Sequence, residues 1–294
     1  MAQRKKKRVT RASQSDVSGG AARPGATVSS KLLQLQTEII QHARQASLRH
    51  NPPTELGRFD RAVFERGVSI LHAVQVLAAA GHWETANAPV RQLFELLVNM
   101  EHLNTFPDRE LAAIKFVQFG SLQEARAALA ELELAETRGA RISLAQLTQA
   151  RTALSNPAYA QFRSVDKNGR ERWAQSWSGK SIRALCEASS NDLRLVNYQT
   201  LFSTWSEQVH GSPGALVRGI VSSVFPDRPY LHDEETQTEA VITMSIVQFL
   251  ELWKLLPQAP VLAEPLRGEW LLRLQALTLI RRAGEGPLLM EFAL

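Results

Sequence analysis

The stretch from Trp83 to Phe106 constrains the fold of this chain more than any other feature of the sequence. Its apolar residues recur at intervals of three and four, which predicts a helix rather than a strand. At about 100° per residue, the polar residues Arg91, Glu95, Asn99 and His102 fall within about 80° of one another around the helix axis. Most of the remaining circumference is apolar, so we expect a buried helix whose polar stripe pairs internally or faces a polar cavity.

Helical periodicity and capping residues predict further helices along the rest of the chain. They run from Ser29 or Ser30 to about His50, from Thr54 to Leu77, from Pro107 towards Arg138, from Ser143 to Leu154, from Ser181 through Cys186, from Asn191 or Asp192 to His210, from Thr236 to Leu256, and from Trp270 to Arg282. Asn168-Gly169 between two short extended segments predicts one β-hairpin. The sequence therefore predicts an all-α fold, a single bundle-like domain of many helices with a small β-hairpin excursion.

The basic residues are unevenly placed along the chain. Residues 1–28 hold seven Lys and Arg residues against Asp16 alone, although the net charge of the whole chain is only +5. We expect a disordered basic tail over 1–28, a helical domain over 29–260 and a C-terminal helical extension over 261–294. Residues 4–11 are candidates for nonspecific contact with nucleic acid, with a solubilising tail without a fixed partner as the alternative. The folded body itself carries no excess of positive charge that would predict a nucleic-acid surface.

Cysteine usage and hydropathy limit the environment of the protein. Cys186 is the single cysteine, so no disulfide forms within the chain. No uninterrupted apolar run approaches the roughly 18 residues that cross a bilayer, and no secretory signal follows the basic N-terminus. We therefore expect a cytoplasmic protein without a membrane span.

Motifs for cofactors and metals are missing from the sequence. Gly179-Lys180-Ser181 suggests a phosphate-binding loop, but Ala174 stands where that loop needs its first glycine. Neither a His-Glu-x-x-His nor a Cys-x-x-Cys spacing is present. We expect no cofactor and no metal.

A second polar element is predicted between Leu193 and His210. Tyr198, Ser203, Ser206 and His210 offer donors and acceptors that complement the first stripe if the two helices pack together. The predicted binding residues are Arg91, Glu95, Asn99, Tyr198, Ser203 and Ser206, and the candidate catalytic residues are His102 and His210.

With these elements in view, the chain resembles a bacterial all-helical family of unknown function, DUF5677. The resemblance rests on Ala88-Pro89-Val90-Arg91-Gln92-Leu93-Phe94-Glu95, on Trp177-Ser178-Gly179-Lys180-Ser181, and on Tyr198 to Ser203 followed by Ser206 and His210-Gly211-Ser212. It covers roughly residues 60–255. It implies a helical fold and supplies no activity.

Three functions are compatible with these residues, and the sequence leaves open whether the protein is an enzyme. The first is an interaction or ligand-sensing module, in which the polar seam binds a small polar ligand or is structural and the body acts on a protein partner or as a homo-oligomer. The alternative is a metal-independent nuclease acting on RNA, with the two histidines as acid and base and Arg91 stabilising phosphate charge. Ten residues separate Arg91 from His102, which departs from the spacing of known helical nucleases of that type. A metal hydrolase using Glu95, His102 and His210 is the third.

Overall fold

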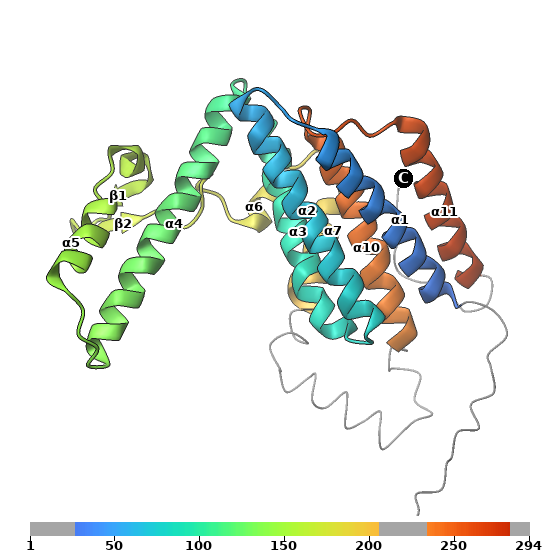
Figure 1. The fold of residues 1–294 in the computed structure, drawn as a ribbon, viewed down its shortest axis with the longest axis horizontal. Coiled ribbons are helices and arrows are strands. Elements are labelled where there is room, and N and C mark those ends of the chain that lie inside the picture. The colour runs from blue at the N-terminus through green and yellow to red at the C-terminus, as the bar shows by residue number, and fades with distance from the viewer. Residues whose placement is uncertain (1–26, 206–233, 283–294) are drawn as a thin grey trace, which may run out of the picture.

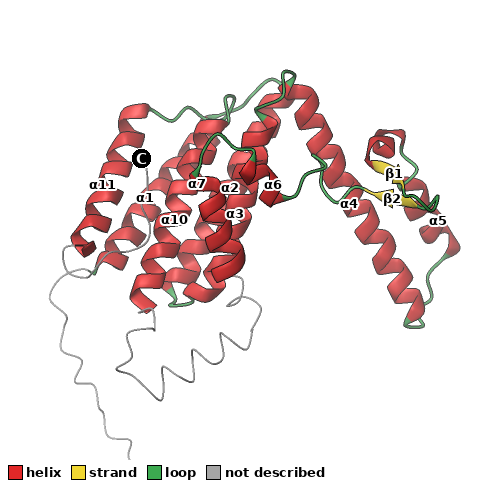
Figure 2. Cartoon of the chain, turned by 180° about the vertical axis from the view of Figure 1, so that it is seen from behind, coloured by secondary structure: helices red, strands yellow, loops and turns green. Residues whose placement is uncertain are grey.

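The described part of the chain forms a helical bundle from which one long helix projects as an arm (Figure 1). The computed structural model describes residues 27–205 and 234–282. The bundle contains α1 (Val28–Arg49), α2 (Glu55–Ala79), α3 (Trp83–Leu103), α10 (Glu234–Leu255) and α11 (Glu264–Arg282). Seen from behind, helices dominate and one pair of strands lies on the arm (Figure 2). The predicted all-α fold with one small hairpin is confirmed.

Aliphatic and aromatic side chains from the five bundle helices pack together in one hydrophobic core. The ring of Phe64 on α2 packs on Trp253 and Phe249 of α10, with centroid distances of 4.7 and 5.8 Å. A Cβ at Gly67 of α2 would lie only 2.9 Å from Leu252 Cδ2, so this glycine permits the close approach of α2 and α10. Trp270 of α11 is 1% exposed and donates its indole N–H to Glu38 of α1 at 2.8 Å. The last helix is therefore packed onto the first.

Side-chain caps define where most helices begin. Thr54 and Ser143 accept hydrogen bonds from backbone N–H groups at the starts of α2 and α5, as their positions in the sequence predicted. Helix α4 begins at Arg109 with Asp108 as its cap, whereas the sequence had placed Pro107 and Asp108 in its first turn. The cap of α1 lies two or three residues earlier than predicted, because Thr27 rather than Ser29 or Ser30 caps the helix by accepting from the N–H of Ser30. Residues 1–26 of the predicted tail lie outside the described residues.

The arm consists of α4 (Arg109–Thr137), α5 (Leu144–Ala153), the 3₁₀ turn η1 (Pro157–Phe162) and the strands β1 (Arg163–Val165) and β2 (Glu171–Trp173). The strands pair antiparallel, with Ser164 opposite Arg172. Asp166 closes the turn by accepting from the N–H groups of Asn168 and Arg170, and Gly169 takes a φ of 76°. Because only glycine adopts that φ without strain, the Asn-Gly signal located the hairpin correctly.

The chain returns from the arm to the bundle through α6 (Ile182–Glu187), α7 (Leu193–Gln199) and the π-helical turn η2 (Thr200–Thr204). Leu201, Trp205, Leu185 and Cys186 form a second, smaller core with Phe94 of α3 and its neighbours on α2 and α10. The helix predicted up to His210 is thus split into α7 and η2, and residues 206–210 lie outside the described part.

Helix α2 is long and apolar enough to cross a membrane by length and composition alone, which the search for uninterrupted apolar runs did not predict. In the fold, 44% of its most apolar window is buried. It packs against α1, α3 and α10, so the apolar face of α2 is the one that fills the centre of the bundle. A helix in the core of a bundle can meet the same criterion of length and apolar composition. The result for α2 is therefore weak evidence for a membrane span.

Candidate functional site

The polar stripe of α3 lies at the surface of the bundle. Arg91, Glu95, Asn99 and His102 share one side of the helix, and each is half-buried. Leu93, Phe94, Leu97 and Met100 are fully buried on the other sides. The periodicity therefore located the stripe correctly, but the prediction that its charged groups are buried is wrong. The helix is contacted by α2, α10 and the returning chain, and the returning chain covers the stripe only in part, so its residues stay half-buried.

Arg91 is held between a carboxylate and an aromatic ring. Its Nε donates to Glu95 Oε1 at 3.3 Å, and its guanidinium carbon lies 3.7 Å from the ring centroid of Phe202 in η2. Tyr198 of α7 stacks on the opposite side of this pair, 4.5 Å from Phe202. The two polar elements therefore do meet, through a guanidinium and two rings. Tyr198 contributes its ring to this contact, where the sequence had suggested its hydroxyl.

Asn99 and His102 are joined to the segment that follows the hairpin. Asn99 accepts from the indole N–H of Trp177 at 2.6 Å and donates to the backbone carbonyl of Glu95 at 2.7 Å. The imidazole of His102 contacts the rings of Phe106 and Trp177, with centroids 5.2 and 5.6 Å away. Burial, followed by the positive charges of Lys180 and Lys115, lowers the pKa of His102 below its ordinary value.

The stripe does not gather its members at one reacting atom. Arg91 and His102 are three helical turns apart, which corresponds to about 16 Å along the axis. Arg91 contacts Glu95 and Phe202, whereas His102 contacts Phe106 and Trp177, so the two groups are held by different neighbours. Ser206 and His210 lie outside the described residues, as does the side chain of Ser203.

An ion-pair network around the buried Arg194, beside the stripe of α3, was not predicted. Arg194 of α7 is 3% exposed and donates to both carboxylate oxygens of Glu101 at 2.9 Å and to Glu251 of α10 at 2.8 Å. The network joins three helices that are far apart in the sequence. Periodicity could show only that Glu101 lies outside the stripe. Nothing in the sequence indicated which arginine would reach it.

Cys186 lies beside this network and is not a nucleophile. Burial raises the pKa of its thiol to about 11, with a further contribution from the negative charge of Glu101. The thiol is therefore protonated at neutral pH, and a protonated thiol reacts poorly.

A second unpredicted ion pair fixes the root of the arm. Asp60 of α2 is fully buried and accepts from Arg109 at the start of α4, at 2.5 Å. Its other oxygen accepts from the backbone N–H of Gln258 at 3.0 Å. Arg109 also donates to Asn104 at 2.7 Å. The direction in which α4 leaves the bundle is set by these contacts.

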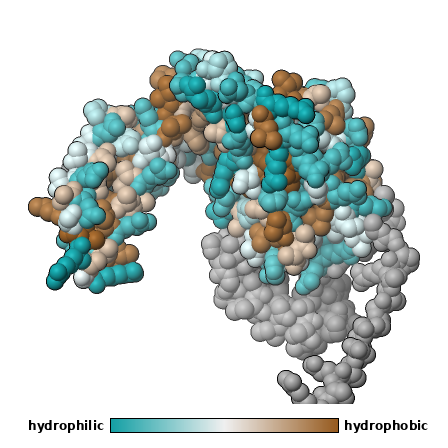
Figure 3. Space-filling view, viewed as in Figure 1, coloured by the Kyte–Doolittle hydropathy of each residue, from teal (hydrophilic) through white to brown (hydrophobic). Residues whose placement is uncertain are grey.

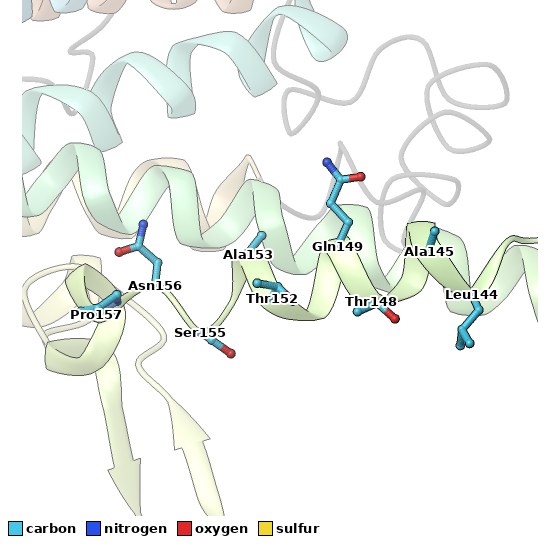
Figure 4. Close-up of a pocket in the computed structure, with 9 residues that line it drawn as sticks. All are labelled: Leu144, Ala145, Thr148, Gln149, Thr152, Ala153, Ser155, Asn156 and Pro157. Atoms are coloured by element: carbon cyan, nitrogen blue, oxygen red, sulfur yellow. The ribbon is translucent and has the colours of Figure 1, made fainter.

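One open depression of the described structure lies on the arm. It runs along α5 from Leu144 to Pro157 and encloses about 1120 Å³. Figure 4 shows its side chains leaving α5 in several directions, with Gln149 and Leu144 pointing to opposite sides. The polar groups do not converge there. Over residues 27–205 and 234–282, no three His, Cys, Asp or Glu side chains are grouped as metal ligands would be.

We expect Glu95→Ala to destabilise the fold by less than about 1 kcal/mol, because pairs exposed to this degree contribute little. The Arg91 and Glu95 side chains are 35% and 39% exposed, so Arg91 keeps access to water when its partner is lost. Urea denaturation of the variant and the unmodified protein measures the difference. A loss above about 2 kcal/mol would show that the pair is effectively buried in solution.

Fold and site together define an all-α protein with a projecting helical arm and a half-exposed polar stripe on its central helix. Residues 61–223 match a family of unknown function, DUF5677, and the chain belongs to that family. The matched region begins within α2 and includes the stripe, the arm and the return through α7. It ends before α10, short of the extent that the resemblance suggested. No curated protein and no solved structure matches the chain.

Proposed function

We propose that this protein is an interaction module that pairs with a second copy of itself through α4. The observation that carries this proposal is a helical seam on α4 whose residues are exposed or half-buried. Positions spaced alternately by three and four along α4 are Leu111, Ile114, Gln118, Ser121, Ala125, Ala128, Leu132 and Ala135. This is the spacing of a coiled-coil seam, yet none of these residues is buried.

The arm uses a different side of α4 for its own packing. Phe119 and Leu122 are buried, and Phe119 contacts Phe162 of η1 with a centroid distance of 5.3 Å. Around the axis of α4, most of the seam residues point away from the face that carries Phe119. Leu111 and Ile114 at its start are 63% and 45% exposed, and Val117 beside them is 52% exposed. Hydrophobic side chains are accordingly visible on the arm as well as on the bundle (Figure 3).

A second copy of α4 fits this seam because the residue sizes along it are self-complementary. Antiparallel pairing about residue 123 places Leu111 opposite Ala135 and Ile114 opposite Leu132 in the partner copy. The middle positions are small, with Ser121 opposite Ala125, which allows the two helices to approach closely. A two-fold contact of this kind uses the same patch on both copies.

We expect the unmodified protein to form a dimer and Ile114→Glu to form a monomer, because a carboxylate in the paired seam would have no partner. Multi-angle light scattering after size exclusion, over a range of protein concentrations, measures the mass against the 32.7 kDa chain. Val196→Glu is the matched control, since Val196 is a 53% exposed valine on α7, away from the arm.

A monomer at every concentration for the unmodified protein would contradict the proposal, as would equal dissociation of both variants. Helical content by circular dichroism must be retained in Ile114→Glu for the mass to be informative. The nuclease alternative has less support, because Arg91 and His102 are separated along α3. A cytoplasmic location and a polyanion contact of residues 4–11 stay predictions.

A further inference from the structure

We propose that the β-hairpin of the arm binds in the major groove of duplex DNA through its exposed cationic tip. This inference goes beyond self-association and does not depend on it. It rests on three features of the hairpin: both of its faces are open to solvent, its base is fixed to the helices of the arm, and its tip carries exposed cations.

Both faces of the hairpin are open. Figure 1 shows β1 and β2 on the arm, away from the bundle. The register places Val165 opposite Glu171 on one face and Ser164 opposite Arg172 on the other, and all four side chains are exposed. A two-stranded ribbon with two open faces can enter a groove that has a wall on each side.

The base of the hairpin is fixed to the arm. Arg163 donates to the backbone carbonyl of Leu154 at 2.7 Å, and its guanidinium carbon lies 4.6 Å from the ring centroid of Trp173. Gln161, two residues before β1, donates to Gln118 of α4 at 2.7 Å. These contacts orient the hairpin on α4 and α5 before a ligand binds. An element held in this way loses less conformational entropy on binding.

The tip of the hairpin concentrates positive charge. Lys167, Arg170 and Arg172 lie within six residues, beside the carboxylates of Asp166 and Glu171. Arg172 pairs with Asp166 at 2.9 Å, yet its side chain is 68% exposed. Lys167 and Arg170 are exposed, and neither takes part in an ion pair within the described part of the chain. The tip therefore offers cations to an external anion.

Duplex DNA fits both the charge and the shape of this hairpin. Lysine and arginine side chains neutralise backbone phosphates, which line both edges of a groove. The major groove of B-DNA is about 12 Å wide and admits a two-stranded ribbon, whereas the major groove of an RNA duplex is too narrow for side chains to read. The charge of residues 29–294 is nearly balanced as a whole, so only the local placement of cations indicates this surface.

The test compares DNA binding by the full chain with that of the double variant Lys167→Gln, Arg170→Gln. The binding of a short fluorescein-labelled DNA duplex is measured by anisotropy between about 50 and 200 mM NaCl. We expect the Kd of the variant to be roughly tenfold higher or more at about 100 mM NaCl. The dependence of log Kd on log salt should become shallower by about two, because each lost phosphate contact removes about 0.9 from the slope. Residues 4–11 are the same in both proteins, so any contact they make is common to both.

The double variant Arg44→Gln, Lys254→Gln is the matched control. It also removes one arginine and one lysine, both exposed, but from α1 and α10 of the bundle. It should bind DNA like the unmodified protein. Equal Kd values for the hairpin variant and the unmodified protein would overturn the proposal, as would equal weakening in the two double variants or no binding by the unmodified protein. Because Lys167 and Arg170 are exposed, we expect the melting temperature to be unchanged, which circular dichroism checks.

A second comparison tests whether the hairpin enters the major groove. The unmodified protein and the hairpin variant are titrated with an RNA duplex of the same sequence. The loss of affinity caused by the two hairpin substitutions should be larger on DNA than on RNA, because the ribbon fits only the wider groove. An equal or larger loss on RNA would contradict binding in the major groove of DNA.

Discussion

Glu101→Ala is expected to destabilise the protein by about 3 kcal/mol, the usual scale for leaving a buried charge without its partner. Arg194 is 3% exposed and depends on Glu101 for its bidentate contact. Burial acts to lower the pKa of Arg194, but its bonds to Glu101 and the charge of Glu251 outweigh burial and raise it. An arginine does not lose its proton in a protein, so the guanidinium stays charged in the variant, with only the contact to Glu251 remaining.

A double-mutant cycle tests the cause of this loss. Removing both charges in the double variant Glu101→Met, Arg194→Met should cost less than Glu101→Met alone, because no buried cation is then left without a partner. Chemical denaturation of both single variants and the double variant supplies the coupling energy. If the double variant loses as much as the sum of the single variants, the two side chains do not interact in solution.

The comparison with Glu95→Ala tests whether burial decides the value of an ion pair in this protein. Both glutamates lie on α3 and both pair with an arginine, but Arg194 has a side chain that is 4% exposed and Arg91 one that is 35% exposed. Water solvates Arg91 when its partner is removed and cannot reach Arg194. We therefore expect Glu101→Ala to lose more stability than Glu95→Ala, and this order is a stronger prediction than the size of either loss.

Asp60→Ala is expected to cost about 3 kcal/mol and to loosen the root of the arm. The fully buried carboxylate accepts from Arg109 and from the backbone N–H of Gln258, and alanine leaves both donors without an acceptor. Urea denaturation gives the loss in stability. Hydrogen exchange should show faster opening of the first turns of α4 than of the centre of α3.

Asp108→Ala is the matched control for this prediction. Asp108 lies one residue before Arg109 and caps α4 through the N–H of Leu111 at 2.9 Å, but it is exposed. Loss of this cap should cost about 1 kcal/mol and leave the Asp60 contact intact. Equal effects of the two substitutions would contradict a special role for Asp60 in holding the arm.

Local patterns in the sequence were sufficient for the elements and for the contacts within one element. The spacing of three and four in α3 placed Arg91 one turn from Glu95, and their ion pair forms as that spacing predicted. Thr54 and Ser143 begin helices because a side-chain oxygen caps the N–H groups that follow it. The two partners of each of these interactions lie within four residues of each other, so a local sequence pattern is enough to identify both.

Local sequence patterns could not predict which side chains are exposed or which distant residues form ion pairs. Whether the stripe of α3 is buried depends on which of its sides the other helices leave open. The pairing of Glu101 with Arg194 joins residues 93 positions apart, and Asp60 meets Arg109 across 49 positions. Many arginines and carboxylates are chemically equivalent in the sequence, and only the packing of helices selects among them.

The sequence by itself therefore determined an all-α chain, the position of its polar stripe, its hairpin and its membership of DUF5677. Tertiary structure alone decided that the stripe is half-exposed, that Arg91 and His102 contact different side chains, and that α4 projects from the bundle with a seam of exposed and half-buried residues. The physical reason is the distance along the chain over which each kind of interaction acts. Helix propensity, capping and periodicity act over a few residues, whereas burial and charge pairing are settled only when distant segments compete for the same surface of the core.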